Sequence, residues 1–234
     1  MKSGLLLAAL LSSSSLWAQV SNVQLKGALA ETAKLGRIQG GEGLPQFSSN
    51  NIKGTRYLFQ NWSSGVVTTV NNTTETGYLL MFDKENNDIY ARRKNSDTVI
   101  LVFKDQVKNF ELNNTVFVRG TQIESGDPDL FYQALAGSKD SIMFYKSIKT
   151  KFVKADKHDA ERIKKGDFDD AYQDEVSYFI KQPNQPLQKI NLTQRSLVKV
   201  IPAKAQQIKA YFRTRIAEEE NESVVAKLIA GLEP

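Results

Sequence analysis

The sequence predicts an α+β fold, in which an antiparallel β domain at 51–192 (a meander, a barrel-like sheet or a sandwich) precedes a short C-terminal helical tail at 193–234. Short apolar runs with a period of two, separated by polar turns, fill the first region. After Thr193 the period of the apolar residues changes to 3.6, which is typical of amphipathic helices. Because no helical pattern long enough for a parallel crossover interrupts the strands, we expect an antiparallel sheet with the helices added after it.

The run Thr98–Phe103 (TVILVF) is the most apolar of the strand candidates, and we expect the rest of the β domain to pack around it. Six residues that are mostly β-branched or aromatic suit a strand and are too few for a stable helix. The run is unbroken rather than alternating, which predicts burial on both faces. Asp97, Lys104 and Asp105 flank it as charges that discourage pairing with other chains.

The other predicted strands are short and are joined by turns of polar residues and glycine. Ser141–Val153 alternates, which places Phe144 and Ile148 on a buried face and Lys149 and Lys151 on a solvated one. The strands predicted besides these two are Val66–Val70, Tyr78–Phe82, Ile89–Arg92, Val107–Leu112, Thr115–Val118, Leu130–Leu135, Glu175–Lys181 and Leu187–Leu192.

Three helical segments are expected after the last strand. Thr193 is placed to cap a helix over Ser196–Ile201, and Pro202 ends that helix and opens the next, whose apolar stripe includes Ile208. Asn221 is the expected cap of the final helix. Burial of each large apolar side chain contributes roughly 1.5–3 kcal/mol, so the tail should dock on the sheet. The inward residues of the final helix are Val224, Val225, Leu228, Ile229 and Leu232.

Residues 1–18 have the pattern of a secretory signal peptide, and we expect cleavage after Ala18. Lys2 provides the positive start, Leu5–Leu11 the apolar segment, and small residues precede the cleavage position. The mature protein is therefore expected in the periplasm or secreted. Residues 19–50 are rich in glycine toward their end and are predicted to form a mobile leader, with at most one short helix.

Composition narrows the class of protein further. The 234 residues are 41% hydrophobic and 24% charged, as in an ordinary globular protein. The absence of cysteine excludes a disulfide and the lipid-anchored cysteine of exported bacterial proteins, so we expect a soluble monomer. No later apolar stretch approaches the roughly 18 residues of a transmembrane segment. Loss of Lys2 lowers the formal charge from +5 to +4, too mild an excess to favour nucleic acid as a partner.

Residues that could carry chemistry are few, and we predict no catalytic residue, no metal site and no cofactor. His158 is the only histidine, and without cysteine or a Gly-x-Ser-x-Gly motif no nucleophile and base are indicated. The acidic segment Asp156–Glu175, taken as a long solvated loop, could bind calcium but lacks the EF-hand order of ligands. Trp62 beside Tyr57 and Phe59 fits a core cluster better than a sugar-stacking platform.

The least ordinary composition lies at 181–217, which holds eight basic residues and no acidic one. Lys204, Lys209 and Arg213 are the candidate binding residues, because Ile208 and Phe212 supply a separate apolar stripe. One hypothesis is that these cations contact an anionic partner. The alternative, slightly favoured by sequence alone, is that the acidic segment at 156–175 neutralises them within the molecule.

The order of features resembles a family of exported Gram-negative bacterial proteins without an assigned activity. The resemblance covers roughly 54–232 and implies export and a β-then-α layout, but it implies no catalytic residue. The residues that carry it are Gly54, Tyr57, Leu58, Trp62, Gly65 and Val66 at the opening, Lys108, Phe110 and Leu112, the run Lys149–Ala155, then Tyr172, Asp174, Glu175 and Tyr178, and finally Ser196, Leu197, Lys199, Leu228, Ile229 and Leu232.

These observations lead to two functional hypotheses. The first is an exported, soluble, non-enzymatic module of the cell envelope that binds an envelope protein or an anionic surface polymer. The second is a glycan hydrolase that uses paired carboxylates, since such catalysis leaves no short motif. A flat or convex basic surface would favour the first hypothesis, and a deep cleft with two carboxyl groups beneath aromatic walls would favour the second.

Overall fold

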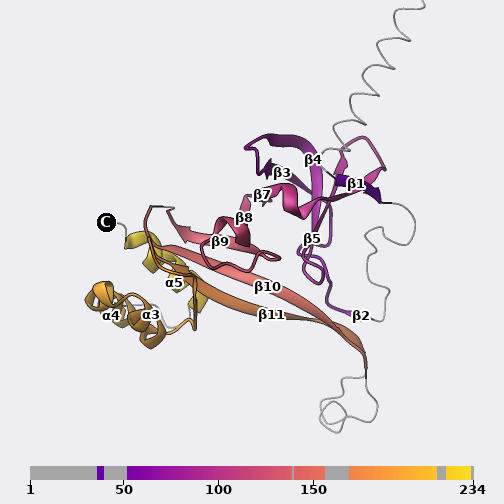
Figure 1. The fold of residues 1–234 in the computed structure, drawn as a ribbon. Helices are drawn as coiled ribbons and strands as arrows, with labels where there is room; N and C mark the ends of the chain where they lie inside the picture. The colour runs from indigo at the N-terminus through magenta and orange to yellow at the C-terminus, as the bar shows by residue number, and fades with distance from the viewer. Residues whose placement is uncertain (1–35, 40–51, 139, 156–168, 215–219, 233–234) are drawn as a thin grey trace, which may run out of the picture.

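The computed structural model describes residues 36–39, 52–138, 140–155, 169–214 and 220–232 (Figure 1). The predicted signal peptide at 1–18, the leader apart from 36–39, and His158 lie outside the described residues. The strands form one open sheet, and the helices follow it in the chain, so the predicted α+β class is confirmed.

The sheet is antiparallel between neighbours from β1 to β12, in the order β1-β6-β5-β4-β3-β7-β8-β9-β10-β11-β12, while β2 pairs with β11 in parallel. Its strands are β1 (Gly36–Gln39), β2 (Ile52–Lys53), β3 (Ser63–Thr69), β4 (Thr74–Asp83), β5 (Asp88–Arg93), β6 (Val99–Val102), β7 (Val107–Leu112), β8 (Thr115–Arg119), β9 (Phe131–Gly137), β10 (Met143–Val153), β11 (Asp170–Lys181) and β12 (Gln188–Ile190).

Strand β6 is the predicted central run, and both of its faces are covered. Ile100 and Val102 lie in the main core, while Val99 packs into a smaller cluster on the opposite face. The strand is flanked by β5 and by β1, a strand that the sequence analysis did not predict. Phe103, just beyond β6, is 40% exposed and lies outside the buried run.

The main core is aromatic at its centre and collects side chains from β3 to β9. The ring of Phe110 stacks on that of Phe117 with centroids 4.7 Å apart, and Phe131 meets Phe110 edge-on at 5.1 Å. Because side chains of β6 join this cluster together with those of β8 and β9, the sheet curls around it without closing.

The paired strands β10 and β11 extend away from the curled sheet as a long ribbon (Figure 1). At the end of the ribbon where β10 begins and β11 ends, one face packs against the helices through Phe144 and Ile180. The opposite face carries Tyr145 and Phe179, which pack with Tyr132 of β9. β11 begins at Asp170 and not at the predicted Glu175, so the prediction of a loop is wrong for Asp170–Asp174.

The helices cover the ribbon with their apolar stripes. They are α3 (Gln194–Val200), the 3-10 turn η4 (Pro202–Lys204), α4 (Ala205–Thr214) and α5 (Asn221–Gly231); two further 3-10 turns, η2 (Lys104–Gln106) and η3 (Gly120–Gln122), lie between strands. The Thr193 hydroxyl accepts a hydrogen bond from the Ser196 amide at 3.2 Å, which confirms the predicted cap. The predicted cap at Asn221 is wrong by one residue, because Glu220 occupies the N-cap position.

A polar contact fastens α5 to the ribbon. The Tyr178 hydroxyl donates a hydrogen bond to Glu222 at 2.6 Å, and the Lys146 ammonium lies 2.8 Å from the same carboxylate. Burial, and then the hydrogen bond to Glu222, raise the pKa of Tyr178 above its ordinary value of 10.0. The neutral phenol is therefore the form that the folded protein favours.

Ile100→Ala should lower the free energy of unfolding by about 2–5 kcal/mol, because the side chain is 1% exposed in the main core and its removal leaves a cavity. Urea denaturation measures the change. Phe103→Ala is the matched control at the exposed end of the same run and should cost far less. Equal losses for the two variants would contradict the assigned boundary of the buried strand.

Raising the pH above 10 should destabilise the protein partly through Tyr178. A group with a raised folded pKa contributes its stability below the unfolded pKa and loses it as the pH rises through the folded pKa. As the pH rises from below 10 to above 10, the free energy of unfolding should therefore fall less in Tyr178→Phe than in the wild type. Some slope should remain, because burial also raises the pKa of Tyr132 and of Tyr145. An unchanged slope would show that the phenol remains accessible to base.

Candidate functional site

The three predicted binding residues do not share one environment. Lys209 and Arg213 lie one helical turn apart on α4, and both are exposed. Lys204 belongs to the 3-10 turn η4 and is half-buried. The structure thus places Lys209 and Arg213 on one helix as exposed residues, and Lys204 differs from them in its element and its burial.

Further cations lie on neighbouring elements of the same segment. Arg195 and Lys199 of α3 are exposed, as is Lys189 of β12. Among the described residues, neither Lys209 nor Arg213 forms an ion pair. We use the term cationic pair for Lys209 and Arg213, the two predicted binding residues that lie on one helix.

Asp174 and Glu175, two described acids of the segment at 156–175, form ion pairs with lysines outside the helices, and Asp170 accepts a hydrogen bond from the Ala155 amide. Asp174 lies 2.7 Å from Lys84, and Glu175 lies 3.1 Å from Lys151. The hydrogen bond and charge of Lys151 hold the pKa of Glu175 below its ordinary value. The acids that the structure describes in this segment are thus engaged away from the cationic pair; those at 156–168 lie outside its described part.

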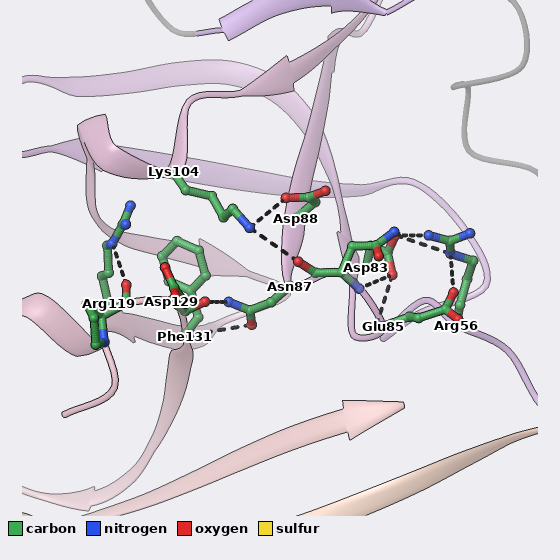
Figure 2. A network of polar contacts seen from close by, with 11 residues as sticks. Arg56, Asp83, Glu85, Asn87, Asp88, Lys104, Arg119, Asp129 and Phe131 are labelled. Atoms are coloured by element: carbon green, nitrogen blue, oxygen red, sulfur yellow. Dashed lines mark hydrogen bonds and ion pairs between the residues drawn. The ribbon is translucent and has the colours of Figure 1, made fainter. Parts of the chain in front are cut away.

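A second polar site, which sequence analysis missed, surrounds the turn between β4 and β5 (Figure 2). Asp83 is fully buried and accepts hydrogen bonds from the amides of Glu85 and Asn86. The Arg56 guanidinium binds the same carboxylate and also lies 3.5 Å from Glu85. The buried charge is thus compensated by a cation and by backbone donors, as burial requires.

The far side of this turn reaches the segment before β9. The Asn87 side chain donates a hydrogen bond to the Asp129 carbonyl and accepts one from the Phe131 amide (Figure 2). Lys104, which follows β6, lies 3.0 Å from the Asp88 carboxylate and donates a hydrogen bond to the Asn86 carbonyl. The turn therefore fixes the positions of two segments that are distant in the sequence.

Lys84 links the turn to the ribbon of β10 and β11. The residue is 6% exposed, and its ammonium donates to both oxygens of Asp174 at 2.7 and 2.8 Å. The Thr150 hydroxyl donates to the same carboxylate, and the Thr150 amide donates to the Lys84 carbonyl at 3.3 Å. The contact therefore combines an ion pair with a backbone hydrogen bond between the two parts of the sheet.

The chemistry of these groups is that of a structural junction. Asp83 and Asp174 are each held by a cation and by further hydrogen-bond donors of the protein, so both carboxylates serve contacts between segments of the sheet. The turn sequence DKENND predicted only a hairpin connection, because nothing local in a run of polar residues indicates that a distant strand will cover it.

The aromatic residues that were considered as a sugar-stacking platform are engaged in packing. Tyr57 is buried in the smaller cluster of the sheet, and Trp62 packs against that cluster with Arg92 over its ring at 5.1 Å. These contacts match the predicted core role. The described residues contain no group of three or more potential metal ligands, and none of their helices has the length and apolarity needed to cross a membrane.

Lys84→Met should lower the free energy of unfolding by about 1.5–3 kcal/mol, because it removes charge-assisted hydrogen bonds from a buried position. Lys151→Met is the matched control: it breaks the neighbouring pair with Glu175 on an exposed surface and should change stability little. Urea denaturation of both variants compares them directly. If the two variants lose equal stability, Lys84 does not link the turn to the ribbon.

The chain matches no protein-family model, no curated protein sequence and no solved structure. Inferences about its function therefore rest on the burial, contacts and charges of its own residues.

Proposed function

We propose that this protein is an exported, non-enzymatic binding module of the bacterial cell envelope, which contacts an anionic partner through the cationic pair Lys209 and Arg213. The partner class is an acidic envelope protein or an anionic surface polymer. The observation that carries the proposal is the exposure of both cations on one helix without an acidic partner among the described residues. Export is supported by the signal-peptide pattern at 1–18.

Helix α4 has a buried apolar face and an exposed face that carries the cationic pair, which supports a surface role for the pair. Ile208 is buried in the second core, and Tyr211 and Phe212 pack against it. Lys209 and Arg213 contribute to no such contact, so they are free to meet a ligand without disturbing the helix. Attraction between exposed charges extends only about 8 Å at physiological salt, so the partner has to approach closely.

Glu222 of α5, an acidic residue of the helical tail, is already engaged, because it binds Lys146 and Tyr178 of the ribbon. The remaining exposed cations of the segment, Arg195 and Lys199 on α3, extend the positive region of the helical tail. An extended anion can contact several of these residues at once, which raises its apparent affinity.

A carboxylate-based glycan hydrolase draws less support from the structure. Asp83, Asp88 and Asp174 each form an ion pair with a lysine or arginine. The aromatic residues that could wall a sugar site, Tyr57 and Trp62, are engaged in packing and in stacking with Arg92. No described contact favours a free pair of carboxyl groups for catalysis.

Lys209→Glu combined with Arg213→Glu should reduce binding to an anionic partner and leave the fold intact. The probes are vesicles of phosphatidylcholine with and without phosphatidylglycerol, and a soluble polygalacturonate, each measured by co-sedimentation or titration. Wild-type binding should weaken steeply as the salt concentration rises, because the contact is electrostatic. The melting temperature of the double variant should stay close to that of the wild type.

Lys94→Glu is the matched control for Lys209→Glu, because Lys94 is also exposed and the charge change is identical. Binding that falls equally in both single variants would reflect net charge alone and would contradict a site on α4. A double variant that loses stability but retains binding would show that the cations serve the fold.

A further inference from the structure

Helices α3 and α4 carry two rows of exposed cations. Arg195 and Lys199 form one row on α3, and the cationic pair Lys209 and Arg213 forms the other on α4. None of the four side chains forms an ion pair with an acid that the structure describes. The two helices pack against each other (Figure 1). We call these four residues the double row.

Both rows face away from the second core. Successive residues of an α-helix are about 100° apart around its axis. Arg195 and Lys199 lie two residues before and two residues after the buried Leu197, which places each of them about 160° from it. On α4 the cationic pair lies about 100° and 140° from the buried Ile208. The double row therefore belongs to the solvent-facing surface of the two helices.

The charge of Arg195 opposes the stability of its own helix. Arg195 lies in the first turn of α3, which holds no acidic residue, and the positive end of the helix dipole disfavours a cation there. Lys199 follows four residues later, a spacing at which like charges repel each other. Lys199 itself lies in the last turn, where a cation is favoured. Since the fold does not benefit from the Arg195 charge, we attribute that charge to binding.

The outer surface of α3 and α4 lacks large apolar side chains. The exposed large apolar residues of the described chain, which are Val70, Phe103, Val116 and Val176, all lie on other elements. The centre of a protein–protein interface is apolar and poor in charged residues, so an acidic protein has no matching surface here. A helix that binds in the plane of a membrane inserts its apolar face, and on α3 and α4 that face belongs to the second core. These features favour a hydrated partner that binds through charge and hydrogen bonds.

We propose that the double row binds an acidic polysaccharide, whose carboxylates contact the cations and whose hydroxyl groups bond to Gln206. This inference rests on the proposed function, because it names the partner of the cationic pair. Gln206 is exposed and precedes Lys209 by three residues and Arg213 by seven, so it continues their row on α4. A carboxamide both donates and accepts hydrogen bonds, as sugar hydroxyl groups do. One linear chain can contact both rows, which raises its apparent affinity.

The test compares three anions by titration calorimetry on the mature chain: polygalacturonate, polyglutamate of matched charge, and phosphatidylcholine vesicles containing phosphatidylglycerol. Polygalacturonate should bind most tightly, because among the two polymers only it combines carboxylates with hydroxyl groups. Its methyl ester, which keeps the hydroxyl groups and loses the charge, should not bind. Tighter binding of polyglutamate or of the vesicles would overturn this inference and leave the proposed function standing. If none of the three anions binds, both fail.

Arg195→Glu is the decisive variant, because binding and stability should respond differently. An acid in the first turn of α3 interacts favourably with the helix dipole and with Lys199, so the melting temperature should stay the same or rise. Polygalacturonate binding should weaken roughly two- to thirtyfold, since an attractive contact is replaced by a repulsive one. Lys94→Glu, which reverses one exposed charge elsewhere, should bind as the wild type does. A lower melting temperature with unchanged binding in Arg195→Glu would overturn the proposal.

Gln206→Ala tests the contact with sugar hydroxyl groups. The variant should bind polygalacturonate roughly two- to tenfold more weakly, the effect of one lost hydrogen bond, and should bind polyglutamate as the wild type does. Gln207→Ala is the matched control: Gln207 is also exposed, but it lies about 100° from Ile208 on the side away from the cationic pair. Equal losses in the two variants, or no loss in Gln206→Ala, would overturn the assignment of a polysaccharide.

Discussion

The arrangement of this protein depends on a carboxylate that is completely buried. Asp83 has no access to water, and an unpaired charge at that depth would cost several kcal/mol. Arg56 and the amides of the following turn compensate it, and in doing so they fix the path of the chain from β4 into β5. Because the turn is rigid, Lys84 on its near side and Asn87 on its far side reach defined partners on other strands.

This junction explains how one open sheet supports two cores. The aromatic core belongs to the curled part of the sheet, and the second core lies between the ribbon and the helices. Strand β9 contributes to both, but its pairing with β10 ends at Lys146. Beyond that point the contact of Lys84 with Thr150 and Asp174 holds the ribbon beside the curled sheet. β9 thus fixes the ribbon to the curled sheet as far as Lys146, and the polar turn fixes it at Thr150 and Asp174.

The sequence allowed most strands and the helical tail to be predicted, because their signals are local. Alternation identified β7 and β10, and the Thr193 cap and the stripe around Ile208 identified the start and the inner face of the tail. Three parts of the sheet were not predicted from the sequence, each for the same reason. β1, β2 and the first half of β11 carry few apolar residues and owe their strand form to a partner far along the chain. The candidate cations could be named from composition, but the half-burial of Lys204 in η4 and the exposure of Lys209 depend on how the helices pack.

The parallel pairing of β2 with β11 has a kinetic consequence. It joins Ile52 to Asp170, 118 residues later, so its formation closes a long loop, and the entropy of that closure has to be recovered from a contact of only two residue pairs. Pairings of such large sequence separation form late in folding, after hairpins such as β4–β5 and β10–β11. Until then the edge of β11 extends past Tyr172 without a boundary. A chain that has not yet formed this pairing therefore exposes a longer template than the native protein does, and this stage carries the greatest risk of mispairing between chains.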